Sequence, residues 1–466
     1  MKVMLVNAPL VAGKKQKFTL QPLGILYIAG VLRQNGYEPE LIDCNITDYT
    51  LEDVADLIIR KKPDIVGISV MTPQIINALK IAKMVKGRDN GIKICMGGPH
   101  ISSTGAEVFD FSNDVDFLIR GEGEFKFLQL VKNLNGDHSD VKGLVYRDAD
   151  GKVRINELGE AITELDNLPF PDFAAFDINA YKSPYVERYP MVPLIASRGC
   201  PFNCSFCDAY RTHGRVTRKR SPKNVVDEIE HNIKRFGVGH VAIKDSTFIL
   251  DKKWVGEICD EIIRRGLKIK WNCNSRVDSL DAEILDKVKK AGCVMLGLGV
   301  ESGSQTVLDN IHKRTTLQQI RETFKLIKNV GLKTYAFLMI GNPGDSPANV
   351  RKTIDFAKEL DPDIVAFSVT EAYPGTEIYE WALKNNVLSD PHWYMQEVDT
   401  FIGVAPSSAC LDYPELTKEQ QQMLVKCAYR EFLLRPGYIF KKLAQIKNVG
   451  QIKDLVAAGL EIIRKS

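Results

Sequence analysis

The sequence predicts an α/β protein built in three parts. These are a doubly wound, Rossmann-like parallel sheet, a partial (β/α)6 barrel of the TIM type and a helical C-terminal region. Short apolar runs alternate with helical periodicity over two long stretches, which is typical of parallel sheets. The length of 466 residues allows two or three domains with separate cores. We place the parts at 1–140, 191–390 and 391–466, with a hairpin and linker at 141–190.

Composition and charge favour a cytoplasmic protein. The net charge of +3 gives no reason to expect nucleic acid as a partner, and no apolar segment is long enough to span a membrane. Asn7 and Pro9 break the first apolar run, which therefore predicts a strand rather than a signal peptide. Ten cysteines without a secretory signal indicate a reducing compartment.

In the first part, strands and helices alternate. The predicted strands are 3–6, 39–42, 65–70, 92–96 and 115–119, and the predicted helices are 23–33, 51–60, 74–85 and 125–133. In such a sheet, ligands bind beyond the carboxyl ends of the strands. The candidate binding residues at these ends are Asn7, Pro9, Ser69, Thr72, Gly97, Gly98, Pro99, His100, Gly121, Glu122, Gly123 and Glu124. No nucleotide-binding glycine motif accompanies them.

The connector contains a predicted hairpin at 141–156, which turns at 148–151, and then an extended, proline-rich stretch at 165–172. We expect this connector to cross from one domain to the other. It carries no residues with evident chemistry.

Three cysteines follow in a C-x3-C-x2-C array: Cys200, Cys204 and Cys207. Thiolates at this spacing suit a soft metal or an iron–sulfur cluster. Three ligands on a four-iron cluster leave one iron open to a substrate or cofactor. The alternative is a zinc site completed by His213. The other seven cysteines fall singly and are predicted to be small core residues.

Six strand–helix pairs are predicted from here to about residue 390. Their strands are 194–197, 241–244, 269–273, 294–299, 333–340 and 363–369. Catalytic groups of a barrel gather at the carboxyl ends of its strands. The candidates there are Asp245, Arg276, Glu301, Ser302, Gly341 and Pro343. A basic stretch at 211–223 is either a cofactor neighbourhood or a solvated loop.

The tail is predicted to be helical over 416–434 and 440–464. The second helix is basic and amphipathic, which allows peripheral contact with a membrane surface. We favour a role as a cap over the open side of the barrel.

The cysteine array, with Phe206 just before its third cysteine, resembles the radical S-adenosylmethionine (radical SAM) superfamily. The resemblance implies a [4Fe-4S] cluster on the three cysteines and SAM on the open iron, where reduction yields a 5′-deoxyadenosyl radical. It further implies that SAM is bound by Phe206, Asp245, Arg276, Glu301, Ser302, Gly341 and Pro343. A structural salt bridge is the alternative for Arg276, and capping of the next helix is the alternative for Asp245. Asp345 departs from the glutamate that is commoner in the glycine-rich loop, which leaves details of that loop open.

The stretches 21–30, 97–100 and 121–124 together resemble the cobalamin-binding domain that precedes many radical SAM domains. The resemblance makes the strand-end residues above candidates for cobalamin contacts. The D-x-H-x-x-G motif, whose histidine binds cobalt from below, is absent, and Asp137-His138 is out of register. His100 is left as a cobalt ligand, a hydrogen-bond partner of the corrin or a loop residue.

These resemblances imply a cobalamin-dependent radical SAM methyltransferase that acts on an unactivated carbon. The tail also resembles anaerobic porphyrin-ring cyclases, so a ring-forming or rearrangement reaction without methyl transfer is an alternative. Two further alternatives are a radical SAM enzyme whose first domain has lost cobalamin binding and only binds substrate, and a zinc-stabilised binding module. The expected partners are a small-molecule, lipid, tetrapyrrole or peptide substrate and an electron donor such as flavodoxin or ferredoxin. The sequence names no catalytic residue, substrate or oligomeric state.

Overall fold

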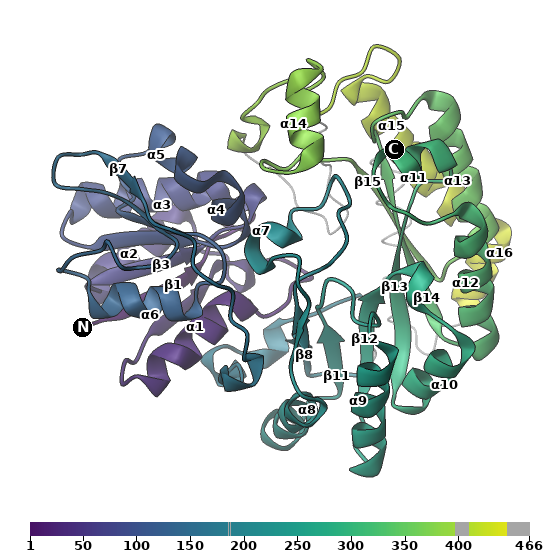
Figure 1. Ribbon diagram of the computed structural model, residues 1–466, viewed down its shortest axis with the longest axis horizontal. Helices are drawn as coiled ribbons and strands as arrows, with labels where there is room; N and C mark the ends of the chain where they lie inside the picture. The colour runs from purple at the N-terminus through teal and green to yellow at the C-terminus, as the bar shows by residue number, and fades with distance from the viewer. Residues whose placement is uncertain (185, 187, 397–409, 445–466) are drawn as a thin grey trace.

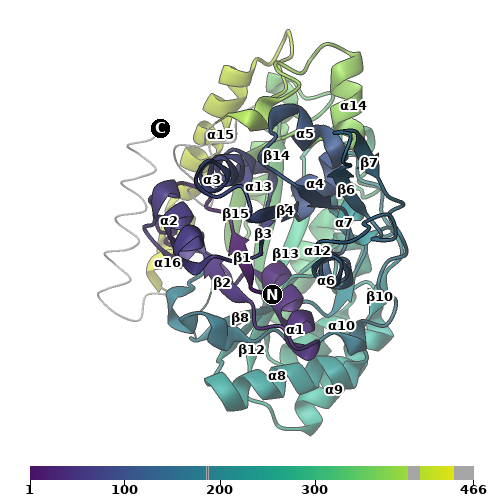
Figure 2. The same ribbon diagram turned by 90° about the vertical axis from the view of Figure 1, so that its left-hand side faces the viewer.

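The computed structural model describes residues 1–184, 186, 188–396 and 410–444. Within these residues the chain forms a seven-stranded sheet from its first part and a six-stranded sheet from its middle part, which lie next to each other (Figure 1). In Figure 2 the first part of the chain faces the viewer, with the six-stranded sheet behind it. The prediction of an α/β protein with parallel sheets is confirmed.

The first sheet has the strand order β2-β1-β3-β4-β5-β6-β7. Its parallel strands are β1 (Val3–Asn7), β2 (Glu40–Asp43), β3 (Ile65–Ser69), β4 (Lys93–Gly97) and β5 (Phe117–Ile119). The predicted hairpin is present as β6 (Leu144–Arg147) and β7 (Val153–Ile155). It adds two antiparallel strands to the edge of this sheet, so this piece of the connector is part of the first sheet.

Helices cover both faces of this sheet. The helices are α1 (Leu23–Gln34), α2 (Leu51–Lys61), α3 (Ile75–Arg88), α4 (Pro99–Thr104), α5 (Val108–Phe111) and α6 (Glu124–Lys132). Alternate residues of β1 point to opposite sides: Val6 packs in one core with α2 and α3, whereas Leu5 packs in another with α1 and α6. Two separate apolar faces explain why these strands are apolar almost throughout.

The second sheet is entirely parallel, in the order β15-β14-β13-β12-β11-β8. Its strands are β8 (Met191–Leu194), β11 (His240–Ile243), β12 (Lys270–Ser275), β13 (Cys293–Glu301), β14 (Lys333–Ile340) and β15 (Ile364–Val369). Five of them match the predicted strands to within a few residues.

The first strand of this sheet was predicted at 194–197, and that prediction is wrong: β8 ends at Leu194. The carboxylate of Asp245 accepts the N–H of Ala196 at 2.8 Å and the hydroxyl of Ser197 at 2.6 Å. The backbone therefore leaves the ladder here. Ser197–Arg198 instead forms a short antiparallel pair, β9, with β10 (Arg218–Lys219).

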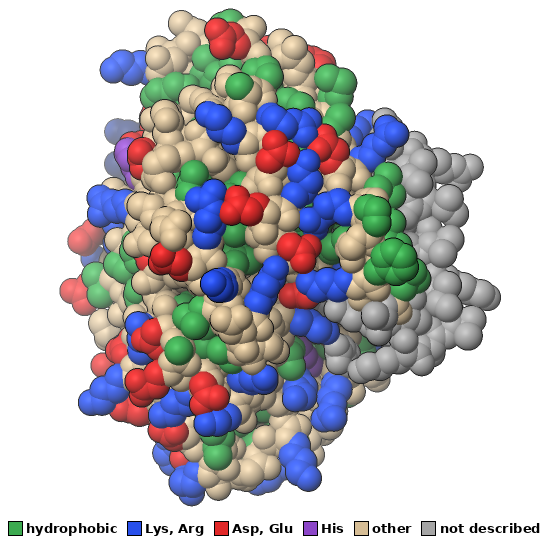
Figure 3. Space-filling view, turned by 90° about the vertical axis from the view of Figure 1, so that its right-hand side faces the viewer, with side chains coloured by type: hydrophobic (Ala, Val, Ile, Leu, Met, Phe, Trp, Pro, Cys, Tyr) green, Lys and Arg blue, Asp and Glu red, His purple; other side chains and the backbone are tan. Residues whose placement is uncertain are grey.

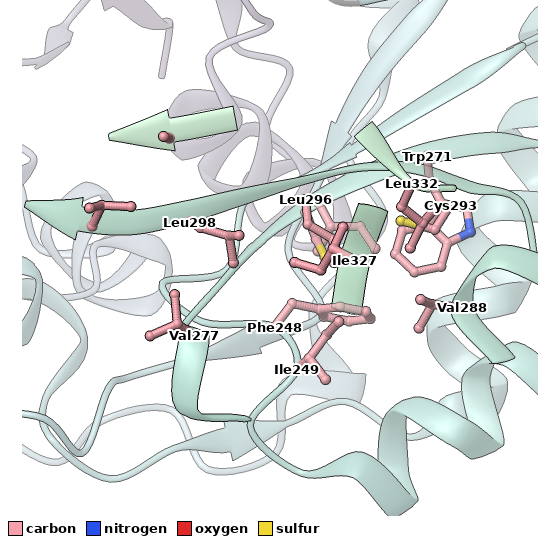
Figure 4. Close-up of a cluster of buried hydrophobic side chains, with 14 of the residues drawn as sticks. Phe248, Ile249, Trp271, Val277, Val288, Cys293, Leu296, Leu298, Ile327 and Leu332 are labelled. Atoms are coloured by element: carbon pink, nitrogen blue, oxygen red, sulfur yellow. The ribbon is translucent and has the colours of Figure 1, made fainter. Parts of the chain in front are cut away.

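The outer face of the second sheet is covered by α8 (Pro222–Phe236), α9 (Lys252–Arg264), α10 (Ala282–Lys290), α12 (Leu317–Val330) and α13 (Pro347–Leu360). The core between sheet and helices includes Phe248, Trp271, Leu296 and Leu298, all at most 1% exposed (Figure 4). On the opposite side of β12, β14 and β15, every second residue is only half-buried. The sheet therefore has one closed face and one accessible face.

The part predicted as the barrel ends with α14 (Glu377–Lys384), and the tail contains α15 (Lys418–Leu433) and α16 (Pro436–Ala444). The Tyr429 hydroxyl of α15 accepts the N–H of Phe367 at 2.8 Å, and Phe432 meets the Phe367 ring. Helix α15 thus covers the β15 edge of the sheet, which agrees with a capping role. Most of the predicted helix at 440–464, with its expected membrane contact, lies outside the described residues.

Among the described residues no helix is both long and apolar enough to cross a bilayer. On the face drawn in Figure 3, lysine and arginine side chains are interspersed with aspartate and glutamate.

Candidate functional site

The three cysteines of the array lie in the loop between β9 and the short helix α7 (Ala209–His213). Their thiols are free and half-buried. The loop is tied to its surroundings because the Cys200 N–H donates to the Gly214 carbonyl at 3.3 Å and the Ser205 N–H donates to the Ile311 carbonyl at 3.1 Å. Before the first cysteine, Gly199 has φ +89°, and a Cβ there would lie 2.1 Å from the Val216 carbonyl oxygen. Only glycine fits this position.

Two cations act on the cysteine loop: Arg276, directly after β12, and Lys313, 12 residues beyond the end of β13. Burial raises the pKa of Cys204, while the charges of Lys313 and Arg276 act in the opposite direction. Burial raises the pKa of Cys207 to about 11. The neighbouring cations would favour the thiolate form that a metal requires.

His213 does not join the thiols: its Nδ1 lies 3.2 Å from Glu122 Oε1. No group of three or more histidine, cysteine or acidic side chains in the described part of the chain is arranged to hold a single metal ion.

Arg276 follows β12 and faces the cysteine loop. Its guanidinium donates to Asp278 at 2.9 and 2.8 Å and to the Lys313 carbonyl at 2.8 Å. It also stacks over the Phe202 ring, 3.8 Å from the centroid. The structural salt bridge considered for this residue therefore exists, and it fixes the cation beside the cysteines.

Glu301 ends β13 in the left-handed conformation, with φ +63°. Its Oε1 lies 2.7 Å from Lys313 Nζ, and both side chains are at most 8% exposed. A Cβ at Gly299 would meet both groups within 2.5 Å, so this glycine makes room for the ion pair. The Ser302 side chain is fully buried, and its hydroxyl forms a hydrogen bond of 3.1 Å with the Thr353 hydroxyl. Ser302 therefore has a structural role.

The glycine-rich loop follows β14. The Asp345 carboxylate accepts the N–H groups of Gly341 and Asn342, both at 3.0 Å. Burial raises the pKa of Asp345 to about 6. Gly341 has φ +92°, and a Cβ there would lie 2.1 Å from Gln421 Oε1 on α15. Asp345, which stands where a glutamate is commoner, thus has a structural role, because its carboxylate closes the loop that carries Gly341 and Pro343.

Asp245 is fully enclosed at the end of β11. Capping of the next helix, the alternative considered for it, is wrong: α9 is capped by Asp251, which accepts the Trp254 N–H at 3.1 Å. Asp245 instead bonds to Ala196 and Ser197 as described above. Burial raises its pKa to about 7 despite these bonds.

The predicted strand-end residues of the first sheet meet along one edge. The Asn7 amide donates to Asp43 at 2.8 Å, and His100 Nδ1 lies 3.3 Å from the Thr72 hydroxyl. Gly98 has φ +107°, with Val70 backbone 2.8 Å from where a Cβ would stand. His100 is only 1% exposed, and its ring contacts Tyr394. At this edge the backbone of Gly98 packs directly against the backbone of Val70, which leaves no room for a side chain at position 98.

Glu122 and Glu124, at the start of α6, are bound by arginines of the second part. Arg198 donates to Glu122 at 3.1 Å and to Glu124 at 2.6 Å, and all three side chains are at most 7% exposed. Arg218 donates to both oxygens of Glu122 at 2.8 and 3.0 Å. Burial acts to raise the pKa of Glu122, but bonds from His213 and Arg218 outweigh it and hold that pKa well below its ordinary value. This buried charge network joins the Gly121–Gly123 turn to the residue two before Cys200.

Two family models match the chain: the Radical SAM superfamily over residues 194–357 and the B12 binding domain over residues 9–131. An uncharacterised methyltransferase of Pyrococcus horikoshii is 33% identical, with 95% of this chain and 94% of that protein covered. The chain belongs to the cobalamin-binding radical SAM family. An anaerobic magnesium-protoporphyrin IX monomethyl ester cyclase of Rubrivivax gelatinosus is 31% identical, covering 77% of this chain and 66% of the cyclase.

The fold agrees with this membership. The solved structure of OxsB, a cobalamin-dependent SAM radical enzyme with aqua-cobalamin bound, superimposes with a TM-score of 0.76. The match covers 100% of this chain and 71% of that one at 20% identity.

The cofactors of the family are a [4Fe-4S] cluster, SAM and cobalamin, and the residues present fit them. Three half-buried thiols with cations beside them suit iron–sulfur ligation. The carboxylate and two cations at Glu301, Lys313 and Arg276 suit a zwitterion such as SAM. At the carboxyl edge of the first sheet, Gly97, Gly98 and Pro99 are partly or fully exposed, which suits contact with a large ring.

Four residues of this radical SAM site escaped prediction: Phe202, Lys313, Arg198 and Gln421. Lys313 lies 12 residues after Glu301, Gln421 lies far along the chain from Gly341, and no local pattern marks either of them. Arg198 stands directly before the conspicuous Gly199-Cys200 pair, which is the one signal that could have drawn attention to it.

We expect His100 to make stability depend on pH. Burial lowers its pKa to about 4, whereas the unfolded chain has the ordinary value of about 6.5. Between these values the unfolded state binds the extra proton, so stability falls as pH drops from about 6.5 to 4, by up to about 3 kcal/mol. Urea unfolding of wild type and His100→Phe across this range measures the difference. Equal slopes for the two proteins contradict the prediction.

Proposed function

We propose that this chain is a cobalamin-dependent radical SAM methyltransferase that acts on an unactivated carbon. The observation that carries the proposal is the half-buried thiol array with Arg276 and the Glu301–Lys313 pair beside it, in a chain that aligns along nearly all of a relative named as a methyltransferase. When bound, the cluster supplies the electron that cleaves SAM, and cobalamin supplies the methyl group. The catalytic residues of the transfer are left unassigned.

In this proposal Cys200, Cys204 and Cys207 hold the cluster. Glu301 binds the amine or ribose hydroxyls of SAM, because its carboxylate accepts hydrogen bonds and carries a compensating charge. Arg276 and Lys313 attract the carboxylate of SAM. Both cations are already oriented by protein contacts, so little side-chain entropy remains to be lost when SAM binds.

The remaining predicted contacts to SAM divide into two groups. Phe206, Gly341 and Pro343 would border SAM directly. Asp245 and Ser302 act through the backbone, since their polar atoms are engaged with Ser197 and Thr353. We interpret the six-stranded sheet as the partial TIM-type barrel that brings these residues to one end.

The first part is proposed to be the Rossmann-like cobalamin domain, with its contacts at the strand ends. Asn7, Ser69, Thr72, Gly97, Gly98 and His100 line this edge, and Pro9, Pro99, Gly121 and Gly123 shape its turns. Glu122 and Glu124 would support the Gly121 turn rather than touch cobalamin, because Arg198 and Arg218 occupy their oxygens.

The test is anaerobic purification with cobalamin supplied, followed by metal analysis and incubation with SAM and a reductant. We expect about four irons and one cobalt per chain, and both S-adenosylhomocysteine and 5′-deoxyadenosine as products once a substrate is present. Reduced flavodoxin or ferredoxin is the proposed electron donor, to be compared with dithionite. Iron without cobalt would remove methyl transfer, and zinc alone would remove the whole proposal.

A ring-forming reaction is the second candidate, favoured by the 31% identity to the Rubrivivax gelatinosus cyclase over 77% of this chain. That reaction consumes SAM without forming S-adenosylhomocysteine. Product analysis of the same incubation therefore separates the two candidates.

A further inference from the structure

The accessible inner face of the six-stranded sheet is lined by Asn272, Asn274, Tyr335, Phe337, Ile364 and Ala366. Strand register aligns these residues: Asn274 pairs with Gly297, Gly297 with Tyr335, and Tyr335 with Ile364. Paired residues of parallel strands point to the same side. The Tyr335 and Phe337 rings lie 4.4 Å apart, and a Cβ at Gly297 would come within 3.0 Å of Phe337. Aromatic rings and two amides thus share one half-buried surface.

Lys244 extends this surface at the carboxyl end of β11. Its N–H continues the ladder by donating to the Leu194 carbonyl at 2.8 Å. Val241 and Ile243 belong to the core on the outer face, so the alternation of the strand turns Ala242 and Lys244 inward. Ala242 pairs with Asn272, which places Lys244 beside the row that contains Asn274.

The environment of Lys244 is unusual for a lysine. Its side chain is reached by solvent, yet burial lowers the pKa of its ammonium group below the ordinary value. Among the described residues its ammonium group forms no hydrogen bond or ion pair, whereas Arg276 and Lys313 are both engaged.

We propose that Lys244 binds the anionic group of the substrate, and that the substrate is a carboxylate or phosphate with a flat, apolar body that lies on Tyr335 and Phe337. An exposed, unpaired cation gains a charge-assisted hydrogen bond when it binds an anion. The aromatic rings offer stacking surface for the body of such a molecule, and the Asn274 amide offers hydrogen bonds. The Asn272 amide oxygen already lies 2.7 Å from His240 Nε2. The assignment of the bound anion as the substrate of the reaction rests on the proposed function. The binding of an anion by Lys244 does not depend on which reaction the protein catalyses.

The anion could have a second source, because SAM also carries a carboxylate. Arg276 and Lys313 already stand beside the cysteine loop and are proposed to serve SAM. Lys244 lies two strands away from Glu301, on β11 rather than β13. We therefore assign Lys244 to the substrate, and SAM affinity is the measurement that separates the two sources.

The test uses two probes with the same ring system, 2-naphthoate and the uncharged 2-naphthamide, titrated calorimetrically into the full-length holoenzyme. We expect wild type to bind naphthoate about tenfold or more tightly than naphthamide. Lys244→Met should abolish that difference and leave naphthamide affinity within about twofold. Lys244→Arg should restore it, and Lys253→Met, which removes an exposed lysine from the first turn of α9, should leave it unchanged.

Equal affinities of wild type for the two probes, no binding of naphthoate, or equal losses of both probes in Lys244→Met would each overturn the proposal. So would a loss of SAM affinity in Lys244→Met, measured by equilibrium dialysis, since it would assign the cation to SAM. Failure of the proposed function has a different signature: absent cobalt or absent 5′-deoxyadenosine in wild type, whatever the naphthoate result.

Discussion

Cys204→Ala protein is expected to contain almost no iron and to form 5′-deoxyadenosine at least about a thousandfold more slowly than wild type. The cluster depends on three thiolates that act as one unit, so two of them cannot hold it in place of three. The charges of Lys313 and Arg276 also act on the Cys204 thiol and favour its thiolate form. Iron and sulfide analysis after anaerobic reconstitution, with chromatography of the SAM products, measures the effect.

Cys427→Ala is the matched control, because Cys427 is also free and half-buried but lies on α15. It should keep wild-type iron and activity. Full iron content in Cys204→Ala, or equal losses in both variants, would contradict the assignment of the cluster to the array.

Arg198→Ala should destabilise the protein by about 3–5 kcal/mol. The change leaves Glu124 without its arginine and Glu122 with fewer of its partners, while both carboxylates stay buried. A buried charge without its partner keeps the cost of desolvation and loses the attraction that offset it. We expect a large fall in the midpoint of thermal or urea unfolding.

The control for this variant is Arg264→Ala, which breaks an exposed bridge to Glu261. That bridge has the same N–O distance of 2.6 Å as the Arg198–Glu124 contact, but its arginine side chain is 68% exposed. Exposed pairs contribute about 1 kcal/mol or less. Similar decreases in the free energy of unfolding of the two variants would show that burial does not determine how much the Arg198 ion pairs contribute to stability. Replacing Glu124 by glutamine in the Arg198→Ala background should recover part of the loss, because the buried carboxylate that lost its arginine is then uncharged, whereas Glu122 keeps Arg218.

Much of the fold followed from local pattern. Apolar alternation located all five parallel strands of the first sheet and five strands of the second, because each strand must bury side chains on at least one face. The missed start of the second sheet depends on Asp245, whose carboxylate draws the backbone of Ala196 and Ser197 out of the ladder from 48 residues away in sequence. The hairpin was predicted correctly, but its position on the first sheet depends on pairing between β5 and β6.

The sequence by itself determined the chemistry of the protein: three cysteines at fixed spacing, glycines where backbone must turn or approach closely, and the alternation that makes parallel sheets. Tertiary structure alone decided which charges meet. Arg198 pairs with Glu124 across 74 residues in sequence, and Lys313 pairs with Glu301 at the left-handed end of β13. Lys244 has no ion-pair partner among the described residues. The physical reason is that spacing and periodicity act over a few residues, whereas ion pairing depends on distances and desolvation that exist only once distant strand ends lie together.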